Sequence, residues 1–178
     1  YSEDWVREAE KRGLPNIRNT VDAFKAYVTD KAIALFGKYK VLTAEELHSR
    51  YEIYVEQYAK QINIEGRTAV NMCRKQYLPA VIEYSKELSE SIVSLKEAGG
   101  FDSSVHKELL TRLLGLLASA NGSLAQLESS LDRAIAEQDV TVRAERCRDE
   151  VVPGLRRLRT DIDTLETLLP KYLWPVPA

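Results

Sequence analysis

Four side chains of this protein could act as soft metal ligands or as members of a nucleophilic pair: His48, Cys73, His106 and Cys147. Such chemistry needs its groups within a few ångströms of one another. His48 and Cys73 are 25 residues apart, so on one helix they would lie about 38 Å apart along its axis. We therefore expect an exposed histidine and a buried cysteine, and we assign no metal-binding or catalytic residue.

Paired carboxylates are a second candidate, because two acids buried together can separate their pKa values for acid–base work. The pairs are Glu45-Glu46, Glu52-Glu56 and Asp161-Asp163. Each pair lies among lysines and arginines, and Lys60 follows Glu56 by four residues, the favourable order on a helix face. These acids are predicted to form a solvated, charged surface.

Phosphate or nucleic-acid binding is not favoured either. Between residues 139 and 163, six arginines are matched by six acids, which removes the usual electrostatic driving force. Gly99-Gly100 lacks both the lysine and the preceding strand of a phosphate-binding loop. The sequence therefore predicts neither a nucleotide site nor a nucleic-acid partner in this chain.

The composition is that of a soluble globular chain, with 178 residues, 44% apolar residues and a net charge of −2. No apolar run is long enough to span a bilayer, so no membrane partner is expected. Two widely spaced cysteines do not form a disulfide scaffold and indicate a reducing, cytoplasmic location. The first residue is Tyr1 rather than methionine, and we expect this chain to be a piece of a longer protein.

Apolar residues recur at steps of three and four along most of the chain, which predicts helices. Thr43 and Glu46 have the spacing of a capping box, and the pattern that follows predicts one long helix over about 43–98, kinked at Pro79. At about 1.5 Å per residue such a helix is about 80 Å long, so the molecule should be elongated.

Two further long helices are predicted over about 103–137 and 140–169, the second kinked at Pro153. Because the connections are short, the three long helices must run antiparallel, which favours an intramolecular bundle over an intermolecular coiled coil. The expected fold is all-α: one domain over 1–178, with one or two shorter helices and a connector in 1–42, the long-helix bundle in 43–169 and a tail in 170–178. The residues predicted to form its core are Leu113, Leu117, Leu124, Leu131, Leu155, Leu158 and Ile162.

Most of the tyrosines fall in the first half of the chain. At helical spacing such rings usually line the edge of a core, and a tyrosine-rich interface is the alternative. The exposed members of one aromatic set are the candidates for contact with another domain: Trp5, Tyr51, Tyr54, Tyr58 and Trp174.

Several stretches of the sequence resemble the C-terminal helical domain of type III glutamine synthetases. The most specific are Leu14-Pro15-Asn16-Ile17, Glu46-Leu47-His48-Ser49-Arg50-Tyr51-Glu52 and Leu78-Pro79-Ala80-Val81. The wider blocks are GLPNIRNTVDAF, VLTAEELHSRYEIYVEQYAKQINIE, GRTAVNMCRKQYLPAV and the closing YLWPVP. The likeness covers most of the chain up to about Tyr84 and the last residues, while residues 99–169 share only helical character with the family.

The resemblance implies a C-terminal fragment of a large, cytoplasmic, homo-oligomeric enzyme that joins ammonia to glutamate with ATP and Mg or Mn. The catalytic motifs of that family have no counterpart here, so the fragment by itself is expected to be inactive and to hold no cofactor. It would pack on the catalytic domain of the same polypeptide and aid assembly. A free-standing helical interaction module, and a bundle that senses a small ligand near a proline kink, are the alternatives.

Overall fold

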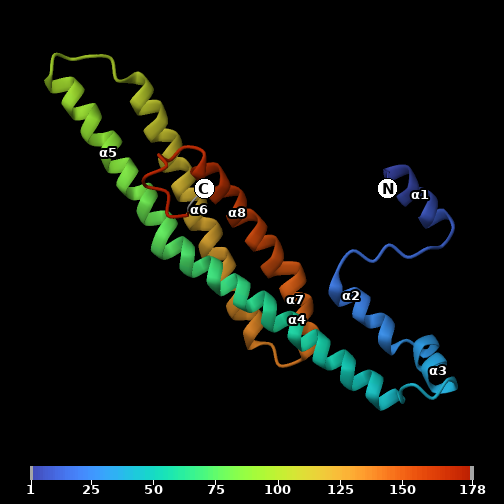
Figure 1. Cartoon of the computed structure of the whole chain (residues 1–178). Coiled ribbons are helices and arrows are strands. Elements are labelled where there is room, and N and C mark those ends of the chain that lie inside the picture. The colour runs from blue at the N-terminus through green and yellow to red at the C-terminus, as the bar shows by residue number, and fades with distance from the viewer. Residues whose placement is uncertain (1, 177–178) are drawn as a thin grey trace.

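The computed structural model describes residues 2–176, and within them every regular element is a helix (Figure 1). Tyr1 and the last two residues of the predicted tail, Pro177 and Ala178, lie outside the described residues. The predicted all-α, antiparallel architecture is confirmed, and no helix in the described part of the chain is long and apolar enough to cross a membrane.

The first long helix begins at the predicted capping box, in which Thr43 and Glu46 each accept a hydrogen bond from the other's backbone N–H. It consists of α4 (Ala44–Met72), a π-helical turn η2 (Cys73–Tyr77) and α5 (Leu78–Glu97). Positive φ angles at Gly99 and Gly100 then turn the chain into α6 (Ser104–Ala136).

The last long helix consists of α7 (Val140–Arg146), a second π-helical turn η3 (Cys147–Val151) and α8 (Val152–Glu166). It ends three residues before the predicted boundary, because the N–H groups of Leu168 and Leu169 both bond to the carbonyl of Leu165 in a tight turn. That turn brings Leu169 into the core, where it is 8% exposed.

A π-helical turn precedes each of the two internal prolines. The N–H of Leu78 bonds to the carbonyl of Cys73, and that of Val152 bonds to the carbonyl of Cys147, both five residues back. Pro79 and Pro153 have no N–H to donate, so near each proline one backbone carbonyl lacks its usual helical partner. The wider π-helical turn accommodates this carbonyl. The helices therefore continue through both prolines.

In the bundle, α6 packs against α5 and α8, while α4 packs against both α6 and α7 (Figure 1). A Cβ on Gly154 of α8 would lie 3.3 Å from a methyl carbon of Leu127 on α6, so the absence of a side chain there allows close approach. Of the seven predicted core residues, five are buried: Leu113, Leu124, Leu131, Leu158 and Ile162. The other two, Leu117 and Leu155, are half-buried against that core.

The N-terminal segment contains α1 (Glu3–Lys11), α2 (Thr20–Lys25), a 3₁₀ turn η1 (Ala26–Val28) and α3 (Asp30–Lys38). The sequence predicted one or two shorter helices in residues 1–42, whereas the described part of this segment contains α1, α2 and α3, because the chain breaks at Thr29. Thr29 adopts an extended conformation and caps α3, while Asn19 caps α2. In Figure 1, α2 lies beside the bundle and α1 stands away from it.

Candidate functional site

The histidines and cysteines are not brought together by the fold. His48 is exposed at the start of α4, whereas His106 is half-buried near the start of α6. Cys73 and Cys147 are buried and unpaired with one another. Burial raises the pKa of Cys73 to about 11 and also raises that of Cys147, so neither thiol is activated. Among residues 2–176, no three His, Cys, Asp or Glu side chains converge as metal ligands would.

The carboxylate pairs take part in ordinary polar contacts. The carboxylate of Glu56 forms an ion pair with the ammonium of Lys60 at 2.8 Å. The hydrogen bond from Lys60 lowers the pKa of Glu56. Asp161 accepts hydrogen bonds from the hydroxyls of Ser119 and Ser123 at 3.0 and 2.7 Å, which join α8 to α6. Asp163 pairs with Arg159 on its own helix. These acids stabilise helices and the contact between α8 and α6, and they do not form a general acid–base pair.

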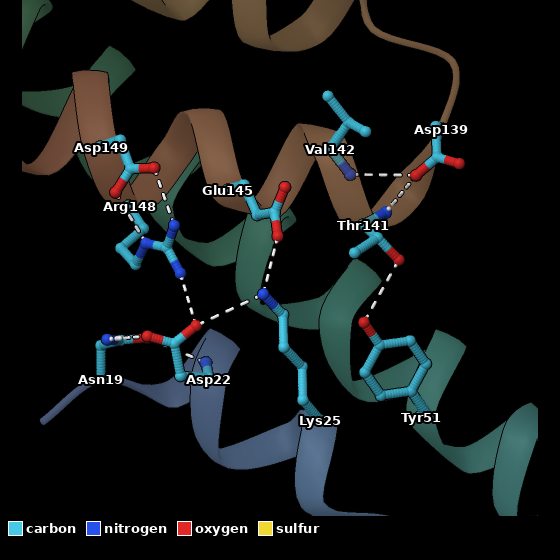
Figure 2. A network of polar contacts seen from close by, with 10 residues as sticks. All are labelled: Asn19, Asp22, Lys25, Tyr51, Asp139, Thr141, Val142, Glu145, Arg148 and Asp149. Atoms are coloured by element: carbon cyan, nitrogen blue, oxygen red, sulfur yellow. Dashed lines mark hydrogen bonds and ion pairs between the residues drawn. The ribbon is translucent and has the colours of Figure 1, made fainter. Parts of the chain in front are cut away.

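The densest polar network lies where α2 meets α7 and η3 (Figure 2). The guanidinium of Arg148 donates to Asp22 at 2.7 Å, and the ammonium of Lys25 donates to Glu145 at 2.8 Å. Both contacts join residues more than 100 positions apart. The network therefore attaches the N-terminal segment to the end of the bundle.

The members of this network favour one another's charged forms. A hydrogen bond from the Asn19 amide, followed by the charge of Arg148, lowers the pKa of Asp22. The hydrogen bond to Glu145 raises the pKa of Lys25. A two-pronged contact with Asp149, at 2.7 and 2.8 Å, fixes the guanidinium of Arg148 in the direction of Asp22. Every charged side chain in this network is paired, so the network serves to attach one segment to another.

Aromatic contacts extend the same attachment. The Tyr54 ring stacks on Phe24 with centroids 5.3 Å apart and meets Tyr27 edge-on at 5.9 Å. The hydroxyls of Tyr51 and Thr141 lie 3.3 Å apart (Figure 2). Tyr51 and Tyr54, two of the three tyrosines of the predicted aromatic set, are thus half-buried inside this chain.

Of the remaining members of the set, Tyr58 and Trp174 pack within this chain and Trp5 is exposed. Tyr58 is half-buried against the core. Trp174 of the tail stacks on Tyr77 with centroids 5.1 Å apart, beside a cavity of about 450 Å³ between α4, η2 and α8. Trp5 on α1 is 48% exposed, so it alone among the five predicted interface residues meets the condition of exposure.

Sequence reasoning missed the residues of the attachment network, namely Asp22, Lys25, Glu145 and Arg148. Their pairing depends on segments distant in sequence, and each charge taken alone is typical of a solvated helix. The one local signal was Asn19 three residues before Asp22, a capping spacing that marks the start of α2.

Comparison with known proteins gives a consistent result. Residues 1–96, just over half of the chain, match the family described as "Glutamine synthetase C-terminal domain". The chain is 33% identical to a glutamine synthetase of Butyrivibrio fibrisolvens over 97% of its length, and 30% identical to the type-3 glutamine synthetase of Dictyostelium discoideum over 99%. A glutamine synthetase of Bacteroides fragilis is 25% identical over 99%. The chain spans 25% of the length of each of these relatives.

Proposed function

Because this chain belongs to the family of glutamine synthetase C-terminal domains, we propose that it is the non-catalytic helical domain of a type-3 enzyme, packing on the catalytic part and aiding assembly. The whole enzyme would join ammonia to glutamate with hydrolysis of ATP to ADP and phosphate. ATP and the divalent metal, Mg or Mn, would bind to the catalytic part. The enzyme would be a homo-oligomer in the cytoplasm, a location consistent with two unpaired cysteines in this chain.

The main support for the packing role is the solvent exposure of α1. This nine-residue helix buries none of its residues, although a helix of that length is unstable alone in water. Its Trp5 is 48% exposed, and the connector that follows exposes Leu14 and Ile17 to a similar extent. Such an apolar surface supports a contact with another domain, because aromatic residues are enriched where interfaces bury most area.

The use of the polar side chains supports a non-catalytic role. Arg148, Lys25 and Asp22 hold the N-terminal segment, and Asp161 joins α8 to α6. Both thiols are buried with raised pKa values, which disfavours the thiolate form that a nucleophile needs. We therefore propose that this chain provides contact surfaces, and that the α1 face contacts the catalytic part.

The first test is an activity assay of the purified chain with glutamate, ammonia, ATP and Mg²⁺. We expect no glutamine to form, and turnover by the chain alone would overturn the non-catalytic assignment.

The second test uses the complete polypeptide that carries this domain. Trp5→Ala should lower the melting temperature or release the domain to limited proteolysis. Val105→Ala, which also removes an exposed apolar side chain but lies at the start of α6, should change neither. Equal behaviour of the two variants would contradict the α1 contact and favour a free-standing interaction module.

A further inference from the structure

The segment that contains α3 carries a run of positive charge. Residues 31–42 include Lys31, Lys38 and Lys40 and no Asp or Glu, although the whole chain has a net charge of −2. All three lysines are exposed, and within residues 2–176 none of them forms an ion pair. The positive charge of this segment is therefore not neutralised by the rest of the described chain.

Large apolar side chains lie exposed among these lysines. Leu35 is 52% exposed and Tyr39 is 65% exposed. Lys31, Leu35 and Lys38 are spaced by four and three residues, so they share one side of α3, and Tyr39 follows Leu35 by four. The ammonium of Lys38 lies 5.6 Å from the centroid of the Tyr39 ring. We call these four residues, with the adjoining Lys40 and Val41, the α3 face.

The described part of the chain leaves this face open. α3 packs on η1 and on α4, yet it buries none of its nine residues. Its half-buried side chains Ile33 and Phe36 lie on a different side of the helix from Lys31 and Lys38. In Figure 1, α3 lies at one end of the molecule, next to the start of α4. A helix of this length gains stability from a partner on its open side.

The backbone at Lys40 is a second unusual feature of the α3 face. Lys40 has a φ of 55°, and no other residue of the described chain apart from glycines has a positive φ. The N–H of the next residue, Val41, bonds to the carbonyl of Phe36, so Lys40 occupies the position after the helix cap where glycine is preferred. A lysine strains the backbone there, and a contact made by its side chain would offset that cost.

We propose that the α3 face docks on an acidic surface of the catalytic part of the same polypeptide. The exposed Leu35 and Tyr39 supply apolar area, and carboxylates on the partner would match the unpaired ammonium groups. A second copy of the same face is disfavoured, because a two-fold contact would bring lysines against lysines. The net charge of −2 disfavours an anionic membrane as the partner.

This inference deepens the proposed packing role and rests on it. α3 belongs to the same N-terminal segment as α1, and neither helix buries a residue. The matched segment makes up 25% of the length of each relative, so most of such a protein is available to cover both helices.

The first test compares amide hydrogen exchange of α3 in this chain alone and in the complete polypeptide that carries it. Protection of α3 at low salt should be at least about tenfold higher in the complete polypeptide. That gain should shrink as the salt concentration is raised, because salt screens exposed charges. Equal protection of α3 in the two proteins would overturn the proposal.

Lys31→Glu tests the role of charge in the complete polypeptide. It reverses a charge in the first turn of α3, where an acid suits a helix, and should remove the gain in protection. Lys107→Glu makes the same reversal at an exposed position in the first turn of α6 and should leave the gain intact. If both variants keep the gain while Trp5→Ala loosens the domain, the α3 contact fails and the proposed function stands. If Trp5→Ala also has no effect, both fail.

Lys40→Gly separates backbone strain from docking. In this chain alone it should raise the melting temperature, because glycine adopts the left-handed conformation without strain. In the complete polypeptide it should lower the protection of α3, because one ammonium group of the contact is lost. Protection of α3 that rises in both proteins would show that Lys40 makes no contact and would overturn the proposal.

Two measurements on this chain alone check the other partners. Light scattering should show no dimer that Lys31→Glu abolishes, and the chain should not sediment with phosphatidylserine vesicles. Either result would assign the α3 face to a second copy or to a membrane and overturn the proposal.

Discussion

Gly66 on α4 lies directly against Leu131 on α6: a Cβ on Gly66 would be only 2.7 Å from Leu131 Cδ2. Leu131 is 1% exposed and belongs to the core, so a Cβ on Gly66 would have to displace a buried methyl group. The absence of a side chain at this one residue therefore determines how closely α4 and α6 approach.

Gly66→Ala should destabilise the bundle although alanine favours helix by about 1 kcal/mol. Overpacking a filled core costs about 1–3 kcal/mol, so a net loss of about 1 kcal/mol is expected in urea unfolding. Gly115→Ala is the matched control: it gains the same propensity, and its Cβ meets nothing within 4 Å. That variant should be stabilised, and a rise in stability for both would mean that Leu131 yields easily.

Leu124→Ala should cost about 2–5 kcal/mol of unfolding free energy, because this side chain is 2% exposed at the centre of the bundle and its removal leaves a cavity. Leu114→Ala, ten residues earlier on the same helix but 47% exposed, should cost less than about 1 kcal/mol. An unaltered melting curve for Leu124→Ala would contradict its place in the core.

Acid should loosen the N-terminal segment before the bundle unfolds. The folded-state pKa of Asp22 lies below its ordinary value of 3.8, so the contribution of this group is fully present above that value. It is lost as the pH falls through the lowered pKa, when the protonated carboxyl no longer pairs with Arg148. The protection of α2 amides against hydrogen exchange, taken relative to the intrinsic rate at each pH, should therefore fall below about pH 4.

Asp22→Asn tests whether this charge is responsible. The variant should show faster exchange in α2 at pH 7, and its difference from the wild type should shrink on acidification. A difference that persists unchanged to low pH would assign the attachment to the Phe24–Tyr54 stacking instead.

Neither thiol should react in the native chain. Burial leaves Cys73 at 1% and Cys147 at 2% exposure and raises both pKa values, that of Cys73 to about 11. At pH 8 a disulfide reagent should modify the native chain only as fast as it opens, and should modify both thiols promptly in denaturant. Rapid labelling of one thiol in the native chain would show that its helix opens locally.

The helical architecture was predictable because local rules determine it. Apolar spacing, the Thr43–Glu46 box and Gly99-Gly100 define the long helices to within a few residues. The break at Thr29 was missed because its extended conformation interrupts an otherwise continuous periodic pattern. The end of α8 at Glu166, before the predicted boundary at residue 169, was missed because a tight turn ends the helix.

The sequence by itself determined the fold class, the order and bounds of the long helices and the family resemblance, since these depend on neighbours three and four residues apart. Only the tertiary structure decided that Tyr54 faces Phe24, that Arg148 reaches Asp22 and that Leu35 of α3 lies outside the core. Those outcomes depend on how distant helices are rotated and spaced. That geometry is set by close contacts such as Gly66 with Leu131, which no periodic pattern encodes.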